Sequence, residues 1–155
     1  MAAYREIAGQ LREQTYLHGD ETGWKVRGQP QNLWTMCNRN LAYFHCDPSR
    51  GSEVPRRLLG KEFAGIVVCD FYAAYNFLPR TQRCLIHLLR DVRDECQLRP
   101  GNAHIKQFGQ RLKKLIEEAV QIQANPPGPD KDKRFRELTK ELDSLARMKL
   151  PGKAA

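Results

Sequence analysis

Residues 65–72 read GIVVCDFY, and this stretch decides the fold that the sequence predicts. The run from Gly65 to Cys69 is apolar at successive positions, which is typical of a central strand covered on both faces. A short helix is predicted just before it, over residues 53–59, and a strand reached by a helical crossover runs parallel to its neighbour. The run ends in Asp70, so a carboxylate is expected at the end of a buried strand.

A second acid occupies a similar place in the N-terminal part of the chain. Residues 17–24 read LHGDETGW, and Asp20 lies within a strand predicted over residues 15–27. Neighbouring strands lie only about 5 Å apart in a sheet, so Asp20 and Asp70 can converge although they are remote in the sequence. Two carboxylates so close repel each other, and a divalent cation resolves the repulsion.

The segments around these acids predict an α/β fold. Turn residues at 28–30 and 38–40 separate three strands, which implies an antiparallel meander, and Ser52 and Gly60 cap the crossover helix. The elements expected before the crossover are a helix over residues 4–14 and strands over 15–27, 32–37 and 41–46. The sequence therefore predicts a mixed sheet of three antiparallel strands, a crossover helix and a central strand.

The rest of the chain is predicted to be helical. A first helix follows Pro79, and two longer amphipathic helices are expected over residues 103–124 and about 131–149, on either side of a proline-rich break. We therefore divide the chain into a sheet-containing part, residues 1–98, and a helical hairpin, residues 99–155.

Composition restricts the class of protein. The 155 residues include 26 Lys and Arg against 18 Asp and Glu, a net charge of +8 that suits DNA or RNA, although many basic proteins bind neither. The five cysteines contain no CxxC pair, which argues against a disulfide framework and against a four-cysteine zinc site. No stretch approaches the roughly 20 apolar residues of a membrane span, and the N-terminus has no apolar signal region. We expect a cytoplasmic protein with no membrane contact.

Five motifs accompany the predicted strands and the first late helix. They are HGDETGWKV at 18–26, PSRGS at 48–52, LGKEFAG at 59–65, CDFYAAYN at 69–76 and QRCLIHLLRD at 82–91. In this order they closely resemble the catalytic domain of the IS66-family insertion-sequence transposases. The resemblance is strong over residues 4–95 and loose over the helical remainder.

The resemblance implies a DDE transposase of bacterial origin with a ribonuclease H-like sheet. In such enzymes two aspartates and a glutamate bind two Mg²⁺ or Mn²⁺ ions, and the motifs carry the two aspartates over to Asp20 and Asp70. The implied chemistry is phosphoryl transfer, in which transposon-end DNA is cut and then joined to target DNA. The implied partner is therefore DNA.

The third acid is missing from the pattern. In the family it lies in an Asn-Asn-x-x-Glu-Arg-like motif after the helical insertion, and nothing here matches it. The glutamates of the late helices are better explained by solvated helix faces; they are Glu117, Glu118, Glu137 and Glu141. We therefore expect an incomplete catalytic core that is inactive alone, with a two-ion site formed only in the complete protein.

Two other readings stay open. One is a non-catalytic DNA-binding or regulatory remnant that associates with itself or with full-length transposase. A third reading is an interaction module with an exposed apolar stripe as its partner surface. The residues of that stripe are Leu112, Leu115, Leu138 and Leu142.

Three residues are candidates for supporting the acids. Alternation along a strand puts Glu21 on the opposite face from Asp20, which favours a structural role over metal binding. Cys84 and His87 lie three apart on a predicted helix, hence on one face, and resemble the Cys-x-x-His signature of several DDE transposase groups. A zinc site would need two further ligands, so a structural role competes with a supporting one.

Basic and aromatic side chains are candidates for DNA contact. Arg83 and Arg90 lie seven apart on the predicted helix and either contact phosphates or are ordinary surface arginines. Trp24 and Trp34, on adjacent predicted strands, can stack on a base, but packing across the strands is favoured.

The two tyrosines after the second acid and the histidine before the first acid also allow a functional or a structural interpretation. Tyr72 and Tyr75 either line the DNA path or pack under the sheet. His18 shares a strand face with Asp20 and is interpreted as a partly buried structural histidine.

Overall fold

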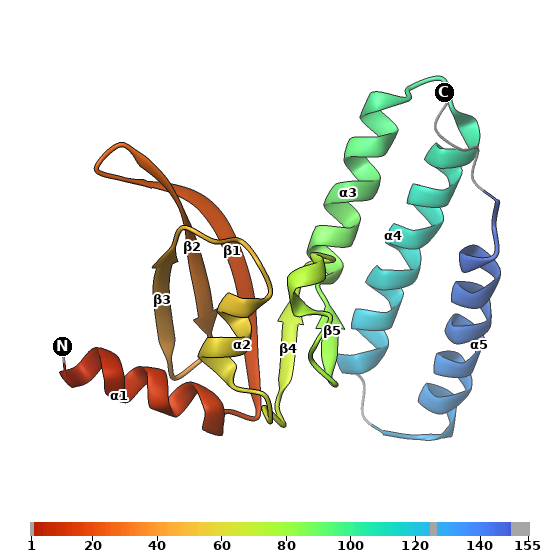
Figure 1. The fold of residues 1–155 in the computed structure, drawn as a ribbon. Helices are drawn as coiled ribbons and strands as arrows, with labels where there is room; N and C mark the ends of the chain where they lie inside the picture. The colour runs from red at the N-terminus through yellow and green to blue at the C-terminus, as the bar shows by residue number, and fades with distance from the viewer. Residues whose placement is uncertain (1, 125–126, 150–155) are drawn as a thin grey trace. The chain divides into compact units, whose positions relative to one another are not determined.

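The computed structural model describes residues 2–124 and 127–149. Within these residues the chain forms a mixed α/β structure with a five-stranded open sheet and five α-helices (Figure 1). It divides into two compact units, one ending at Cys84 and the other beginning at Leu85. The first unit contains the sheet, and the second is helical.

The sheet of the first unit has the strand order β3-β2-β1-β4-β5. β1, β2 and β3 form an antiparallel meander, whereas β4 lies parallel to β1 and β5 parallel to β4. The strands are β1 (Tyr16–Val26), β2 (Gln29–Cys37), β3 (Ala42–Asp47), β4 (Ile66–Cys69) and β5 (Thr81–Arg83). The predicted meander and the central parallel strand are both confirmed.

The helices of the first unit are short. α1 (Ala2–Gln10) continues into a 3₁₀ turn at Leu11–Glu13, and the crossover helix α2 (Glu53–Leu59) connects β3 with β4. Gly60 ends α2 with a φ of 84°, a left-handed conformation that favours glycine, as predicted. Ser52 is the N-cap residue of α2, as predicted, but its side chain makes no capping hydrogen bond. The Ser49 hydroxyl instead accepts a hydrogen bond from the Gly51 amide at 3.0 Å and contacts Glu53.

The core of the first unit lies on one face of the sheet. Odd-numbered residues of β1 up to Glu21 are buried, whereas Tyr16, His18 and Asp20 are exposed. The buried side chains packed there include Leu17, Trp34, Met36, Tyr43, Val54, Leu59, Val67, Cys69 and Tyr75. The expectation that β4 is buried on both faces is correct for one face only, because Val67 and Cys69 are buried while Ile66 and Val68 are half-buried.

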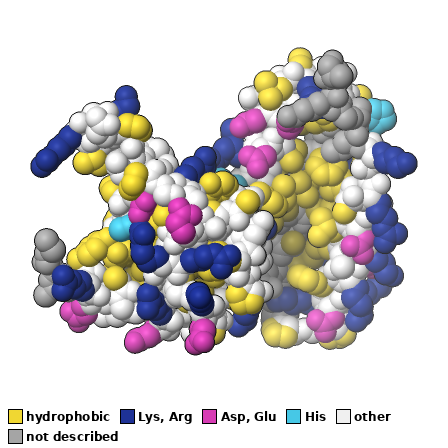
Figure 2. Space-filling view, viewed as in Figure 1, with side chains coloured by type: hydrophobic (Ala, Val, Ile, Leu, Met, Phe, Trp, Pro, Cys, Tyr) yellow, Lys and Arg dark blue, Asp and Glu magenta, His cyan; other side chains and the backbone are white. Residues whose placement is uncertain are grey.

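The second unit consists of three helices, α3 (Leu85–Leu98), α4 (Ala103–Ala124) and α5 (Pro129–Ala146). α4 packs against both α3 and α5. The predicted helical hairpin is therefore present, and the division of the chain falls before α3 because α3 packs along α4. Figure 2 shows hydrophobic side chains gathered along the helices of this unit, with Lys and Arg side chains at the outer edge.

The apolar stripe of the late helices is mostly internal to the second unit. Leu112, Leu115 and Leu138 are buried in a cluster with Ile122 and Leu145, so reading these three leucines as a partner surface is wrong. The fourth leucine of the stripe, Leu142, is 49% exposed. The two long helices thus cover each other's apolar faces.

Strand β5 is an element that the sequence analysis missed. Its three residues pair with β4, and the Cys84 amide extends the ladder by donating to the Cys69 carbonyl at 2.7 Å. The helix that was expected to carry Arg83 and Cys84 therefore begins only at Leu85. In the described residues no disulfide is formed, and no helix is both long and apolar enough to cross a bilayer.

Candidate metal centre

Asp20 lies on β1, and Asp70 is the first residue after the adjacent strand β4. β1 and β4 pair in parallel, and the last partners are His18 and Val68. The same offset continued by two residues reaches Asp20 and Asp70. Asp20 lies on the side of β1 opposite the core, because side chains alternate along a strand. The parallel pairing thus brings both residues to the same end of the β1–β4 ladder.

In each of the two aspartates, a local hydrogen bond engages one carboxylate oxygen, Oδ1. Asp20 is exposed, and its Oδ1 accepts a hydrogen bond from the Glu21 amide at 3.0 Å. Asp70 is half-buried, and its Oδ1 accepts from the Tyr72 amide at 2.9 Å in the turn after β4. Among the residues that the structure describes, no Lys or Arg forms an ion pair with either acid. Both aspartates therefore retain oxygen atoms that can bind a cation.

Glu21 lies on the opposite face from Asp20, as alternation predicts. Its side chain is only 1% exposed and accepts hydrogen bonds from Arg50 at 2.8 and 3.2 Å. The Tyr75 hydroxyl donates to its other oxygen at 3.4 Å. Burial raises the pKa of Glu21, the Arg50 hydrogen bond opposes this rise, and the charges of Asp70 and Asp20 add to it. Glu21 is thus engaged inside the fold but electrostatically coupled to both aspartates.

Arg50 is a residue of this centre that the sequence analysis missed. Its guanidinium lies 4.5 Å from the centre of the Tyr72 ring, and the Tyr72 hydroxyl donates to the Arg50 carbonyl at 2.8 Å. Arg50 therefore connects Glu21 on β1 with the segment that follows Asp70. Arg50 lies in the PSRGS motif at 48–52, but nothing in the spacing of this motif indicates a contact with Glu21.

The aromatic residues divide between the two faces. Tyr75 and Trp34 are fully buried with their rings edge to face at 6.2 Å, which confirms the packing interpretation for both. Trp24 is 55% exposed, so packing across the strands is wrong for this residue. His18 is exposed with its ring 6.1 Å from that of Tyr16, which corrects the interpretation as a partly buried histidine. His18 lies on the face of β1 opposite the core, and Trp24 lies in the part of β1 where every residue is exposed.

Arg83 supports the Asp70 segment from β5. It donates to the Asp70 carbonyl and to Asn76 Oδ1, each at 2.6 Å. Because Arg83 ends a strand, the predicted helical face shared with Arg90 is wrong. The shared helical face of Cys84 and His87 is wrong for the same reason, since α3 begins between them at Leu85. In the described part of the chain, no three His, Cys, Asp or Glu side chains converge as a metal site.

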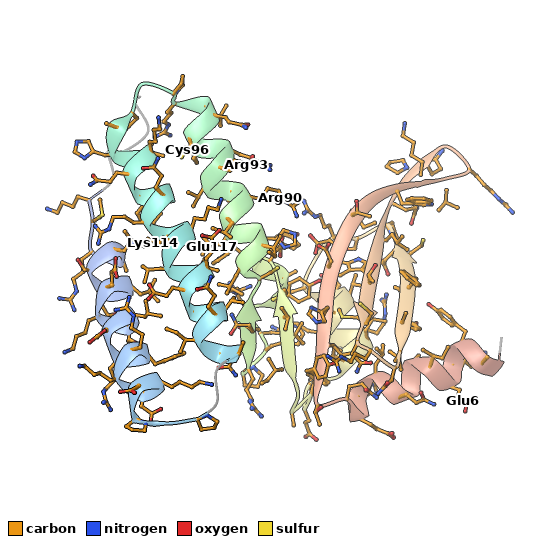
Figure 3. All side chains as sticks on the ribbon, turned by 180° about the vertical axis from the view of Figure 1, so that it is seen from behind. Glu6, Arg90, Arg93, Cys96, Lys114 and Glu117 are labelled. Atoms are coloured by element: carbon orange, nitrogen blue, oxygen red, sulfur yellow. The ribbon has the colours of Figure 1, made fainter. Side chains whose placement is uncertain are left out.

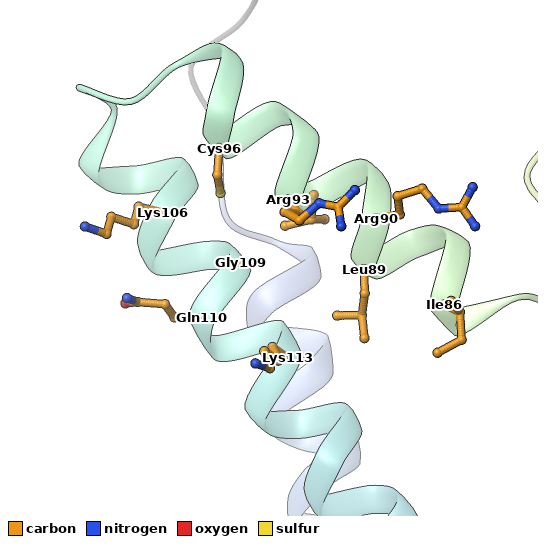
Figure 4. A pocket seen from close by; sticks show the side chains of 10 residues that line it. Ile86, Leu89, Arg90, Arg93, Cys96, Lys106, Gly109, Gln110 and Lys113 are labelled. Carbon is orange, nitrogen blue, oxygen red and sulfur yellow. The ribbon is translucent and has the colours of Figure 1, made fainter.

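The second unit has a cavity of about 570 Å³ between α3 and α4 (Figure 4). Ile86, Leu89 and Val92 contribute apolar walls, and basic side chains surround them. The basic residues of the rim are Arg90, Arg93, Lys106 and Lys113. Arg90, Arg93 and Cys96 follow one another along α3 (Figure 3). Arg90 thus lines this cavity, and none of the residues that line the cavity is an Asp or a Glu.

The late glutamates form ion pairs within the second unit. Each pairs with a basic residue of α4 or α5, as expected of solvated helix faces. The pairs are Glu117 with Lys113, Glu118 with Arg134, Glu137 with Arg134 and Glu141 with Arg111. These contacts account for all four carboxylates.

Comparison with protein families identifies the chain. The family model described as Transposase IS66 family matches residues 1–149. The chain belongs to the IS66 transposase family. No curated protein and no solved structure matches it significantly. The family match confirms the resemblance seen in the motifs and gives this IS66 protein a role related to transposition.

Proposed function

We propose that this IS66-family protein carries part of a DDE-type catalytic core for cutting and joining DNA in the bacterial cytoplasm. The observation that supports the proposal is the parallel pairing of β1 with β4 through His18 and Val68, which are two residues before Asp20 and Asp70. The mixed sheet supports the proposal as well, because its antiparallel meander β1-β2-β3 followed by the parallel strand β4 is the arrangement that the resemblance implied. The two aspartates would bind the catalytic metal.

The donor set suits a hard divalent cation. Mg²⁺ in phosphoryl-transfer sites is held by one or two carboxylates, with water and substrate phosphates completing the shell. Asp20 and Asp70 supply two such carboxylates, each with an oxygen outside the hydrogen bonds described above. When bound, Mg²⁺ or Mn²⁺ supplies Lewis-acid stabilisation and an activated water or 3′-hydroxyl. Among the described residues no third acid joins this pair, so the proposal concerns these two carboxylates.

The protein's own residues position the acids and attract the substrate. Arg83 fixes the backbone of Asp70, and the contacts of Arg50 with Glu21 and Tyr72 fix the adjoining loops. The net charge of +8 favours the DNA backbone, because cations that neutralise phosphates release bound counterions.

Duplex DNA binding with and without Mg²⁺ tests the proposal. The difference in affinity between the wild type and the aspartate variants should reverse its sign when Mg²⁺ is added. In EDTA, Asp20→Asn and Asp70→Asn should each bind a duplex more tightly than the wild type, because each removes a negative charge facing phosphate. In Mg²⁺ the wild type should gain affinity, because a cation held by Asp20 and Asp70 would offset their negative charge toward the DNA, and the variants should not. Asp91→Asn, an exposed acid on α3, is the control and should follow the wild type.

A non-catalytic DNA-binding protein gives a different result. It would bind DNA with the same response to Mg²⁺ in the wild type and in both variants. That outcome would overturn the proposed metal centre and favour the remnant reading.

A further inference from the structure

The β1–β2 hairpin projects beyond the strands on either side of it. β1 pairs with β4 only as far as His18, and β3 pairs with β2 only from Asn32 onward. Residues 24–31 therefore form a two-stranded ribbon with no third strand, which Figure 1 shows as an extended arm. A ribbon of this kind fits into grooves of nucleic acids.

The ribbon tip, defined as residues 24–27, exposes an unusual set of side chains. Trp24 is 55% exposed and Val26 40% exposed, and Lys25 and Arg27 are exposed beside them. The chain contains no Asp or Glu from residue 22 to residue 46, so no nearby acid in the sequence offsets these cations. An exposed indole followed by two exposed cations is suited to a polyanion that carries flat rings.

The backbone of the tip points to the same conclusion. Arg27 and Gly28 form the two-residue turn with φ values of 50° and 79°. Glycine or asparagine adopts the left-handed conformation at lower cost than arginine does. Arg27 therefore occupies a turn position at which the backbone conformation favours glycine or asparagine.

The position of Trp24 relates the tip to the proposed metal centre. Trp24 and Asp20 are four residues apart on β1 and so share one face of the sheet. At about 3.3 Å per residue this separation is about 13 Å, or roughly four nucleotide steps of B-form DNA.

We propose that the ribbon tip is a second DNA contact, which holds the strand a few nucleotides from the position that Asp20 and Asp70 act on. Trp24 stacks on an unpaired base, and Lys25 and Arg27 contact the flanking phosphates. The inference rests on the proposed function for the position of the cut, and it adds the unpaired strand to the substrate.

Tryptophan fluorescence tests the contact directly. The chain has two tryptophans, and Trp34 is fully buried, so quenching by a bound base reports on Trp24. The probe is a synthetic DNA duplex with a short unpaired overhang, titrated in EDTA so that the metal centre makes no contribution. We expect emission to fall on saturation, and to fall less with the blunt-ended duplex of the same sequence.

Two substitutions of Trp24 distinguish aromatic stacking from the contact of any large apolar side chain. Trp24→Phe keeps an aromatic face and should bind the overhang probe within about twofold of the wild type, whereas Trp24→Leu should lose about fivefold or more. Replacing Lys25 and Arg27 together by glutamine should reduce the salt dependence of binding by about two phosphate contacts. The control replaces Arg5 and Lys61, which are also exposed in the first unit, and should leave the salt dependence nearer that of the wild type.

Three results would overturn the inference. They are unchanged emission at saturating DNA, equal affinity of the wild type and Trp24→Leu, and an emission shift that follows protein concentration instead of DNA, which would indicate contact with a second copy. The Mg²⁺ response of the Asp20 and Asp70 variants is measured separately. Failure of the ribbon contact with a retained Mg²⁺ response would therefore leave the proposed function standing.

Discussion

Gly19 is buried in β1, directly before Asp20. A Cβ atom at this position would lie 3.1 Å from both the Tyr75 ring and Val67, and 3.3 Å from the Met36 sulfur. Gly19→Ala should therefore lower the free energy of unfolding by about 1–3 kcal/mol through overpacking. Urea unfolding measures the change.

Gly23 provides the matched control on the same strand. A Cβ atom there would meet nothing within 4 Å, so Gly23→Ala should change stability little. Equal effects of the two substitutions would contradict the close contact at Gly19.

Asp47 gives the first unit a dependence on pH. The Ser49 amide donates to it at 2.9 Å, and this bond, with the Arg57 and His45 side chains, lowers the pKa of Asp47. A lowered pKa means that the stabilisation is present above the ordinary value of 3.8 and is lost as the pH falls through the folded-state pKa.

Asp47→Asn tests this dependence. At neutral pH the variant should be less stable than the wild type by about 1–2 kcal/mol, and the gap should narrow as the pH falls below 3.8. Chemical unfolding over a pH series measures it. A gap of constant size down to strongly acidic pH would contradict the role of the charge.

At the residue scale, the sequence predicted the strand positions of the two acids better than the contacts around them. Asp20 and Asp70 could be singled out because each follows an apolar or strand-forming run. Arg50 could not, because its contact with Glu21 joins a loop to a strand across 29 residues with no periodic pattern. The exposure of Trp24 was also not predictable, since it lies in the part of β1 where neither face is buried.

Helix α4 offers a prediction at the scale of elements, because α3 approaches it closely at Gly109. A Cβ atom there would lie 2.9 Å from Val92 and 3.3 Å from the Cys96 sulfur. Gly109→Ala gains up to about 1 kcal/mol of helix propensity but pays for crowding at the helix interface, so the net effect should be a loss of about 1–2 kcal/mol. Thermal unfolding followed by circular dichroism measures it.

Gly9 in α1 is the corresponding control. A Cβ atom at this helical position would meet nothing within 4 Å, so Gly9→Ala should raise stability by up to about 1 kcal/mol. Stabilisation by both substitutions would show that α3 and α4 do not pack closely at Gly109.

The elements were predictable where the pattern was long. Three strands, the crossover helix and both long helices were expected near their observed bounds, because alternation or helical spacing persists over many residues. β5 was missed because three polar residues show no alternation, and only pairing with β4 makes them a strand. The same pairing delayed the start of α3 and removed the helical faces expected for Cys84 and Arg83.

At the scale of the whole molecule, the residues that the structure describes form two hydrophobic clusters, one in each unit. The buried cluster of the first unit lies between Leu11 and Leu78, and that of the second lies between Leu112 and Leu145. We therefore expect residues 1–84, expressed alone, to fold with β-rich circular dichroism and a cooperative unfolding transition. An unfolded spectrum for this fragment would contradict the independence of its core.

The central claim is that Asp20 and Asp70 together form a divalent-cation site, and calorimetric titration with Mn²⁺ tests it most directly. The experiment compares the wild type with Asp20→Asn, Asp70→Asn and the control Asp91→Asn. The account predicts saturable binding by the wild type and the control, and loss of binding in both aspartate variants. Binding that survives in either variant, or no binding by folded wild-type protein, would contradict it.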